Sequence, residues 1–169
     1  MWDFWSGQEE IKVLDANITA CMDKRELMRQ YVGTGAWIDF TQGLDIRLLD
    51  DDDVADLNRM KIRGLHFAWD NPNDDLKASF ERYASVARKK TKSGAWGTVY
   101  ILTNYEKCTV AEHIKRALYR IEAVEALNYD PYLMIYDKPH AAPELRNLQR
   151  WCNNKRIFKT VKRFQDYTG

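Results

Sequence analysis

Apolar and polar positions follow one another in a repeating order along this chain. A short apolar run ends in a small polar cluster, and the cluster leads into a segment with helical spacing. This order occurs five times, with apolar runs at residues 11–15, 37–41, 65–69, 99–102 and 132–136. Apolar strands with polar residues only at their carboxyl ends are typical of a parallel sheet with a site along one rim. The pattern therefore predicts an α/β protein whose functional residues lie at the carboxyl ends of its strands.

The segments between the runs predict helices. Asp23 is expected to cap the first helix and Gly33 and Gly35 to end it, while the acidic run at residues 50–53 opens the second. Gly43 is expected to turn the chain after the second strand, and Asp130-Pro131 to break the pattern before the fifth. Apolar residues at helical spacing place the helices at about residues 23–31, 54–60, 76–87, 110–121 and 143–151.

The strand–helix unit recurs roughly every 25 to 35 residues, as parallel βα architectures require. Five units are too few for a closed eight-fold barrel. The expected fold is a parallel sheet of βα units, a partial (β/α) TIM-like barrel, with an open sheet as the alternative. We expect residues 1–169 to form a single domain.

Composition narrows the class of protein. With 169 residues and 45% hydrophobic residues, the chain is expected to fold around a core of its own. Its formal net charge of +1 gives no indication of a polyanionic partner, so nucleic acid is not expected. No apolar run approaches the roughly 18 residues of a membrane span. The first residues lack the pattern of a secretory signal, and the three cysteines form no disulfide framework. A soluble cytoplasmic protein is the expectation.

The polar clusters supply the candidate site residues. Any one of them can be a turn former or a helix cap, but turns alone do not require amides, arginine and histidine at strand ends. If the strands are neighbours, these side chains converge on one rim. The candidates are Asp15, Asn17, Gln42, Asp45, Arg47, His66, Asp70, Asn104, Tyr105 and Asp137.

Two candidates have competing interpretations. The guanidinium of Arg47 can hold a ligand carboxylate with two hydrogen bonds, or it can form an ion pair with Asp45 or the acidic run. His66 lies within an apolar strand, where a core or barrel-interior residue is expected more often than a catalyst.

Other residue groups point to simpler roles. Cys21, Cys108 and Cys152 lack the close spacing of iron–sulfur ligands, so ordinary thiols are expected. The acidic run is explained by helix capping rather than by a metal ion. The basic and aromatic tail at residues 155–167 is a candidate for RNA binding.

Six blocks of sequence, taken in order, suggest a family. They resemble the middle and later strands of radical S-adenosylmethionine proteins, and the resemblance extends over nearly the whole chain, from residue 14 to residue 155. The blocks are Leu14–Asn17, Ile38–Leu49, His66–Asp70, Tyr100–Tyr105, Met134–Pro139 and Arg150–Lys155.

The resemblance implies a partial (β/α) barrel, a four-iron–four-sulfur cluster held by three cysteines, and S-adenosylmethionine bound to that cluster. Reductive cleavage of the cofactor would give a deoxyadenosyl radical that abstracts hydrogen from a substrate. It implies that the cofactor contacts Gln42, Asp45, Arg47, Asp15, Asn17, His66 and Asp70. It further implies that Trp69, Asn104, Tyr105 and Asp137 line the substrate site.

The chain departs from the family in one respect. It has no C-x-x-x-C-x-x-C loop and no strand–helix units in which that loop and the glycine-rich second-strand motif would lie. We therefore expect the carboxyl-terminal part of a longer, split or decayed enzyme that is not catalytic alone. A preceding segment or partner chain would cover the edge of the first strand. The alternatives are a non-catalytic binding module and an RNA-binding protein that uses the basic tail.

Overall fold

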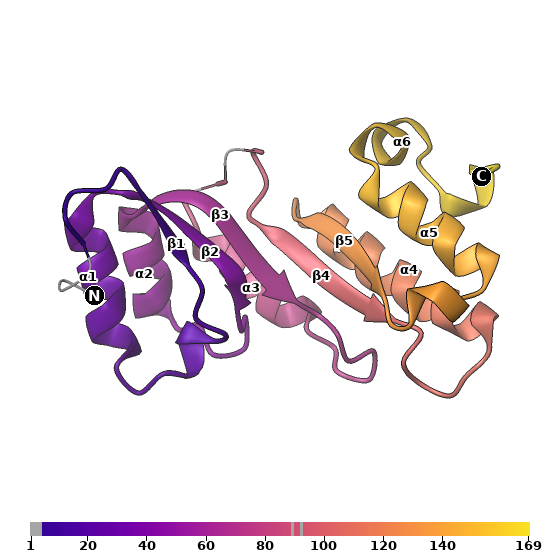
Figure 1. The fold of residues 1–169 in the computed structure, drawn as a ribbon, viewed down its shortest axis with the longest axis horizontal. Coiled ribbons are helices and arrows are strands. Elements are labelled where there is room, and N and C mark those ends of the chain that lie inside the picture. Colours follow the sequence, from indigo (N-terminus) through magenta and orange to yellow (C-terminus); the bar gives the residue numbers. More distant parts are fainter. Residues whose placement is uncertain (1–4, 89, 92) are drawn as a thin grey trace.

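The protein folds as an open sheet of five parallel strands (Figure 1). The computed structural model describes residues 5–88, 90–91 and 93–169. The strands are β1 (Glu10–Val13), β2 (Trp37–Leu44), β3 (Lys61–Ala68), β4 (Thr98–Thr103) and β5 (Asp130–Ile135). They lie side by side in chain order, and every neighbouring pair is parallel. The α/β class and the alternating βα units are confirmed, and the sheet does not close into a barrel.

The helices form a single layer. They are α1 (Lys24–Thr34), α2 (Asp51–Arg59), α3 (Lys77–Val86), α4 (Val110–Ala126), α5 (Pro143–Asn153) and α6 (Lys155–Thr160). Each helix from α1 to α5 contacts the next one, as expected when successive crossovers of one hand return on the same side of a sheet. Short 3-10 turns cover Ile18–Ala20, Lys138–His140 and Phe164–Asp166. In Figure 1, α3 and α4 lie behind the sheet, and no described helix covers its near face.

This one-sided covering explains the alternation within the strands. Ile38, Phe40, Leu65 and Phe67 are at most 2% exposed and face the helices. Residues at the alternate positions, such as His66, point to the uncovered face and are more accessible. The core therefore lies between the sheet and the helix layer.

Aromatic residues join α3 to the centre of the sheet. The ring of Phe67 lies 5.8 Å from that of Phe80, 5.4 Å from that of Tyr83 and 5.9 Å from that of Tyr129, each in an edge-to-face arrangement. The Tyr129 hydroxyl donates to the carbonyl of Phe80 at 3.0 Å, and burial raises the pKa of this phenol. These contacts fix the position of β3, whose carboxyl end leads into the candidate site.

The second strand runs further than its sequence predicts. Instead of ending near Thr41, β2 continues to Leu44 with a shift of register against β3 after Phe40. Gly43 permits the irregularity because it has a φ of +97°, and a Cβ there would approach the carbonyl oxygen of His66 to 3.2 Å. The extension brings Gln42 and Asp45 to the carboxyl rim.

The observed helix boundaries confirm most of the predicted helix starts and ends. Asp50 and Asp53 form a reciprocal capping box at the start of α2, with hydrogen bonds of 2.9 and 3.0 Å. Gly35 follows α1 in the left-handed conformation, with a φ of +64°, whereas Gly33 does not end the helix but lies within it. Asp23 precedes α1, but its side chain makes no capping hydrogen bond.

The two edges of the sheet differ. Pro131 lies within β5, which begins at Asp130 rather than after the proline, because an edge strand tolerates a missing N–H. The carboxamide of Asn153 closes this edge, since its oxygen accepts from the Leu133 amide at 2.8 Å and its nitrogen donates to the Leu133 carbonyl at 2.9 Å. No further strand pairs with β1 in the described part of the chain.

We expect Asn153→Ala to reduce the free energy of unfolding by about 1–3 kcal/mol, because the buried amide of Leu133 would lose its acceptor. Asn147→Ala is the matched control, since Asn147 is exposed on the same helix, and its effect should stay within about 0.5 kcal/mol. Urea unfolding of both variants measures the difference. Equal stabilities would contradict the assigned role of Asn153.

Candidate functional site

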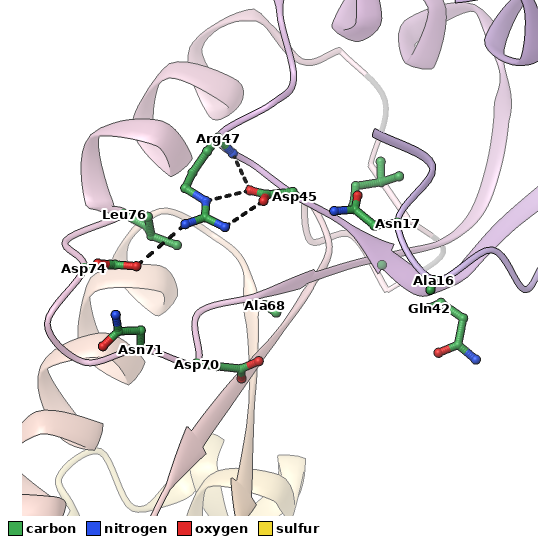
Figure 2. A pocket seen from close by; sticks show the side chains of 12 residues that line it. Ala16, Asn17, Gln42, Asp45, Arg47, Ala68, Asp70, Asn71, Asp74 and Leu76 are labelled. Carbon is green, nitrogen blue, oxygen red and sulfur yellow. Dashed lines mark hydrogen bonds and ion pairs between the residues drawn. The ribbon is translucent and has the colours of Figure 1, made fainter. Parts of the chain in front are cut away.

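A depression of about 260 Å³ lies at the carboxyl ends of β2 and β3, beside the loop that follows β1 (Figure 2). It brings together five of the residues predicted from separate polar clusters. These are Asn17, Gln42, Asp45, Arg47 and Asp70. Asn71 and Asp74, from the loop after β3, complete its polar lining. The parallel sheet thus gathers side chains from three strand ends at one place.

Arg47 is occupied by its neighbour. Its Nε and Nη2 atoms donate to the two carboxylate oxygens of Asp45 at 2.9 and 2.7 Å, and its Nη1 lies 3.6 Å from Asp74 Oδ2. These hydrogen bonds from Arg47 lower the pKa of Asp45. Of the two interpretations of Arg47, the structure contains the ion pair with Asp45, which occupies the Nε–Nη2 edge of the guanidinium.

The loop after β1 is fastened to the end of β2. The hydroxyl of Thr19 accepts from the amide of Asp45 at 3.0 Å, and it also donates to the side chain of Asn17. Asp15 is exposed and accepts from the amide of Asn17 at 3.1 Å, so it acts as a turn former beside the depression. These bonds hold the wall formed by Asn17 and Asp45.

A buried arginine supports the other wall. Arg120, from α4, is 2% exposed and donates to the carbonyls of Trp69 at 2.7 Å and Asp70 at 3.0 Å. Burial lowers the pKa of Arg120 to about 10. Sequence reasoning missed this residue, although an arginine beside Ala117 and Ile121 on an apolar helix face is the signal that identifies it.

The carboxylate of Asp70 has a perturbed pKa. Burial raises its pKa, while a hydrogen bond from the Leu102 amide and the charge of Arg120 act in the opposite direction. Tyr105 donates to the main-chain carbonyl of Asp70 at 3.2 Å, so this predicted substrate residue helps to position the loop. A cation bound beside Asp70 would offset the effect of burial, because it favours the ionised carboxylate.

A second and larger depression, about 780 Å³, lies on the uncovered face of the sheet and shares Gln42 and Asp70 with the first. His66 points into it from β3. The imidazole Nδ1 lies 3.1 Å from the Phe40 carbonyl oxygen, and the ring stacks on that of Tyr100 at 5.5 Å. His66 therefore lies partly exposed on the uncovered face of the sheet and not in the core beneath the helices.

Two buried side-chain oxygens on this face make no hydrogen bond with any described residue. They are Oδ1 of Asp39 and Oγ1 of Thr41, although Nδ1 of His66 lies 3.9 Å from Asp39 Oδ1. The Asp39 carboxylate lies against Gly64, where a Cβ would come within 2.5 Å of its Oδ1. Buried polar atoms are costly unless hydrogen-bonded, so a donor from a bound molecule would stabilise both. Their spacing of two along β2 is the sequence signal for a shared face.

The structure does not place Trp69 in the substrate site for which it was predicted. Its side chain is 1% exposed, donates from the indole nitrogen to the Asp74 carbonyl at 2.6 Å and stacks on Phe80. The alternation of β3 turns it towards the helices, so it belongs to the core and cannot contact a ligand at the rim.

The remaining two candidates lie beyond the depressions. Asn104 and Asp137 adopt positive φ values of 67° and 50° after β4 and β5, as turn residues do. The side-chain carboxamide of Asn104 donates to the Tyr136 carbonyl at 3.0 Å, and the carboxylate of Asp137 lies 2.9 Å from the imidazole Nδ1 of His140. Neither residue lines either depression.

The cysteines do not gather into a metal site. Among residues 5–88, 90–91 and 93–169, no group of three or more His, Cys, Asp or Glu side chains could hold a metal ion. Cys152 is buried, and burial raises the pKa of its thiol to about 12. Cys108 is exposed, and its sulfur lies 3.4 Å from the ring nitrogens of His113.

The basic tail is folded onto the core. Phe158 of α6 and Phe164 pack on Trp151 with ring distances of 4.8 and 5.8 Å. Lys155 pairs with Asp130 at 2.7 Å. The aromatic rings of the tail are therefore used in packing.

Comparison with known proteins finds no protein-family model, no curated protein and no solved structure that matches this chain. None of the described helices is long and apolar enough to cross a membrane.

We expect Asp70→Asn and Asp45→Asn to have opposite effects on stability as the pH changes. The raised pKa of Asp70 means that its ionisation destabilises the fold, so Asp70→Asn should gain stability over the parent protein as the pH rises from 3.5 to 7. The lowered pKa of Asp45 means that its ionised form stabilises the fold. Asp45→Asn should therefore lose up to about 1 kcal/mol at pH 7 and less at pH 3.5.

Thermal unfolding of the three proteins at both pH values measures these changes. If the two variants shift in the same direction relative to the parent protein, the assigned environments of the carboxylates are wrong.

Proposed function

We propose that this chain is a radical S-adenosylmethionine-type domain that binds S-adenosylmethionine at its carboxyl rim and substrate on the uncovered sheet face. The observation that carries the proposal is the rim depression, in which polar side chains from three strand ends of a parallel βα sheet converge. The order of the sequence blocks that resemble this family adds to it. Ligands of parallel α/β folds characteristically bind at this edge.

The charge of the rim suits a cationic ligand. Asp45, Asp70 and Asp74 line the depression together with a single guanidinium, that of Arg47. S-adenosylmethionine carries a sulfonium and an ammonium group against one carboxylate, so its net positive charge complements this excess of acid. The sulfonium and ammonium groups are therefore assigned to the side that Asp70 occupies.

Gln42 is the residue proposed for the cofactor carboxylate. The family resemblance implies that Gln42 and Arg47 both contact the cofactor, but the Nε–Nη2 edge of Arg47 is engaged by Asp45. The Gln42 carboxamide is exposed and makes no hydrogen bond with another described residue, and in Figure 2 it points away from the Arg47–Asp45 pair. An amide donor can bind a carboxylate without a competing ion pair.

The buried oxygens of the uncovered face that lack a hydrogen bond support a ring with hydrogen-bond donors as the adjoining group. Asp39 and Thr41 lie on the same strand as Gln42, and the stacked rings of His66 and Tyr100 stand beside them. Adenine, or a substrate ring, presents amino donors and a flat surface of this kind.

The iron–sulfur cluster does not fit the residues of this chain, because three thiolates are needed and no described group supplies them. Catalysis is therefore proposed only for an assembly in which another segment or chain supplies the cluster loop. The unpaired edge of β1 is the proposed contact for that part. Free cysteines are typical of a reducing compartment, so the cytoplasm is the proposed location.

Titration calorimetry tests cofactor binding directly. We expect S-adenosylmethionine to bind about tenfold more tightly than S-adenosylhomocysteine, which lacks the sulfonium charge, a difference of about 1.4 kcal/mol. Asp70→Asn should reduce this preference, because it removes a carboxylate from the depression. Gln42→Ala should reduce the affinity for both ligands by the same factor.

Arg47→Gln serves as the control for the cofactor carboxylate. Because Arg47 is paired with Asp45, this change should weaken binding of the cofactor less than Gln42→Ala does. Equal affinity for the two ligands in the parent protein would reject the proposed cation site.

Reconstitution with iron and sulfide tests the proposal about the cluster. We expect the chain alone to give no stable four-iron absorption spectrum, because Cys152 is buried and its raised pKa disfavours the thiolate. A stable spectrum that disappears in Cys21→Ala or Cys108→Ala would show that the chain holds a cluster by itself.

A further inference from the structure

Positive charge is concentrated in the last part of the chain. Residues 138–163 contain eight Lys or Arg residues and one Glu, a formal charge of +7, whereas the whole chain carries +1. The near-neutral total therefore conceals a strongly basic region that includes α5 and α6.

Three of these cations line one groove. It has a volume of about 580 Å³ beside β5 and α5 and is lined by Lys138, Arg146, Arg150 and Tyr132, with three carboxamides between them. Arg146 and Arg150 lie one turn apart on α5 and share a face. No described residue forms an ion pair with Lys138, Arg146 or Arg150 (ion pairs elsewhere in this region join Lys155 to Asp130 and Arg163 to Asp166).

Unpaired cations in a common groove favour an anion. The situation is the reverse of that at the rim, where Asp45 neutralises Arg47. A phosphate group would relieve the mutual repulsion of the three side chains and accept their hydrogen bonds.

An aromatic row continues from this groove. Tyr132 is 44% exposed and lines both the groove and the depression on the uncovered face. Its ring lies 5.6 Å from that of Tyr100 in an edge-to-face arrangement, and Tyr100 stacks on His66 at 5.5 Å. The row crosses β5, β4 and β3, so the basic groove opens onto a surface of rings.

We propose that the groove and this aromatic row together bind single-stranded nucleic acid. Phosphates would lie against Lys138, Arg146 and Arg150, and bases would stack on Tyr132 and beside Tyr100. A basic channel next to exposed rings is the usual arrangement for binding unpaired strands, whose bases are free to stack on side chains. The acidic rim at Asp45 and Asp74 repels phosphate, so the backbone is confined to the side of α5. This inference does not rest on S-adenosylmethionine binding, but a base beside Tyr100 would occupy part of the uncovered face that the proposed function assigns to adenine or substrate.

The proposed surface differs from the basic tail. The rings of Phe158 and Phe164 are packed on Trp151 and cannot stack on bases. Arg156 and Lys162 are exposed but do not line the groove, so they provide matched controls for charge.

Fluorescence anisotropy with labelled ten-nucleotide RNA and DNA strands tests the proposal. Tyr132→Ala should weaken binding about 5- to 100-fold through lost stacking, while Tyr132→Phe retains it. The double variant Arg146→Gln/Arg150→Gln should weaken binding and reduce the slope of log affinity against log salt by about 1.4, or about 0.7 for each lost phosphate contact. Tighter binding of the RNA or of the DNA strand identifies which of them is the preferred ligand.

The control double variant Arg156→Gln/Lys162→Gln removes the same charge and should change affinity and slope less. Thermal unfolding establishes that each variant is folded. Equal effects of the two double variants, an unchanged affinity in Tyr132→Ala, or no binding by the parent protein would overturn the proposal. Binding of a mononucleotide as tight as that of the strand would also overturn it, because a strand must contact more than one ring or cation.

Discussion

Burial of one face of the parallel sheet is the constraint on which the rest of the structure depends. The strands follow one another in chain order, and the helices that connect them form one layer. Ile38, Phe67 and the other helix-facing residues supply the core, so the protein does not need the opposite face for its packing. That face is free to carry an imidazole, phenols and a carboxylate, and the candidate groups of the uncovered face follow from this freedom.

The rim is held in place by residues that do not themselves face a ligand. Arg120 donates to the main-chain carbonyls of Trp69 and Asp70, and the hydroxyl of Thr19 accepts from the amide of Asp45. A site built in this way begins with its walls already ordered, so binding costs little conformational entropy. This order has an energetic cost, because the guanidinium of Arg120 is buried and its pKa is lowered.

Charge divides the exposed surface into two regions with different ligands. At the ends of β2 and β3 carboxylates exceed cations, and at α5 three cations have no acidic partner among the described residues. The uncovered sheet face lies between them and contributes rings and buried oxygens that lack a hydrogen bond. A cationic cofactor and a phosphate-bearing strand would therefore bind at opposite sides of one surface, and the formal charge of the whole chain conceals both.

Patterns along the chain were enough to predict the βα units, the start of the second helix at the acidic run and the rim as the location of polar side chains, because each depends on neighbours in sequence. It could not decide that Arg47 pairs with Asp45, that Trp69 faces the core or that β2 continues past Gly43. Nor did it identify Arg120, Asp39 or the α5 groove, whose partners come from distant strands and helices. The sequence by itself determined which residues have the chemistry to bind. Only the tertiary structure decided which of them are free to do so, because a side chain's partners depend on packing between elements far apart in the chain.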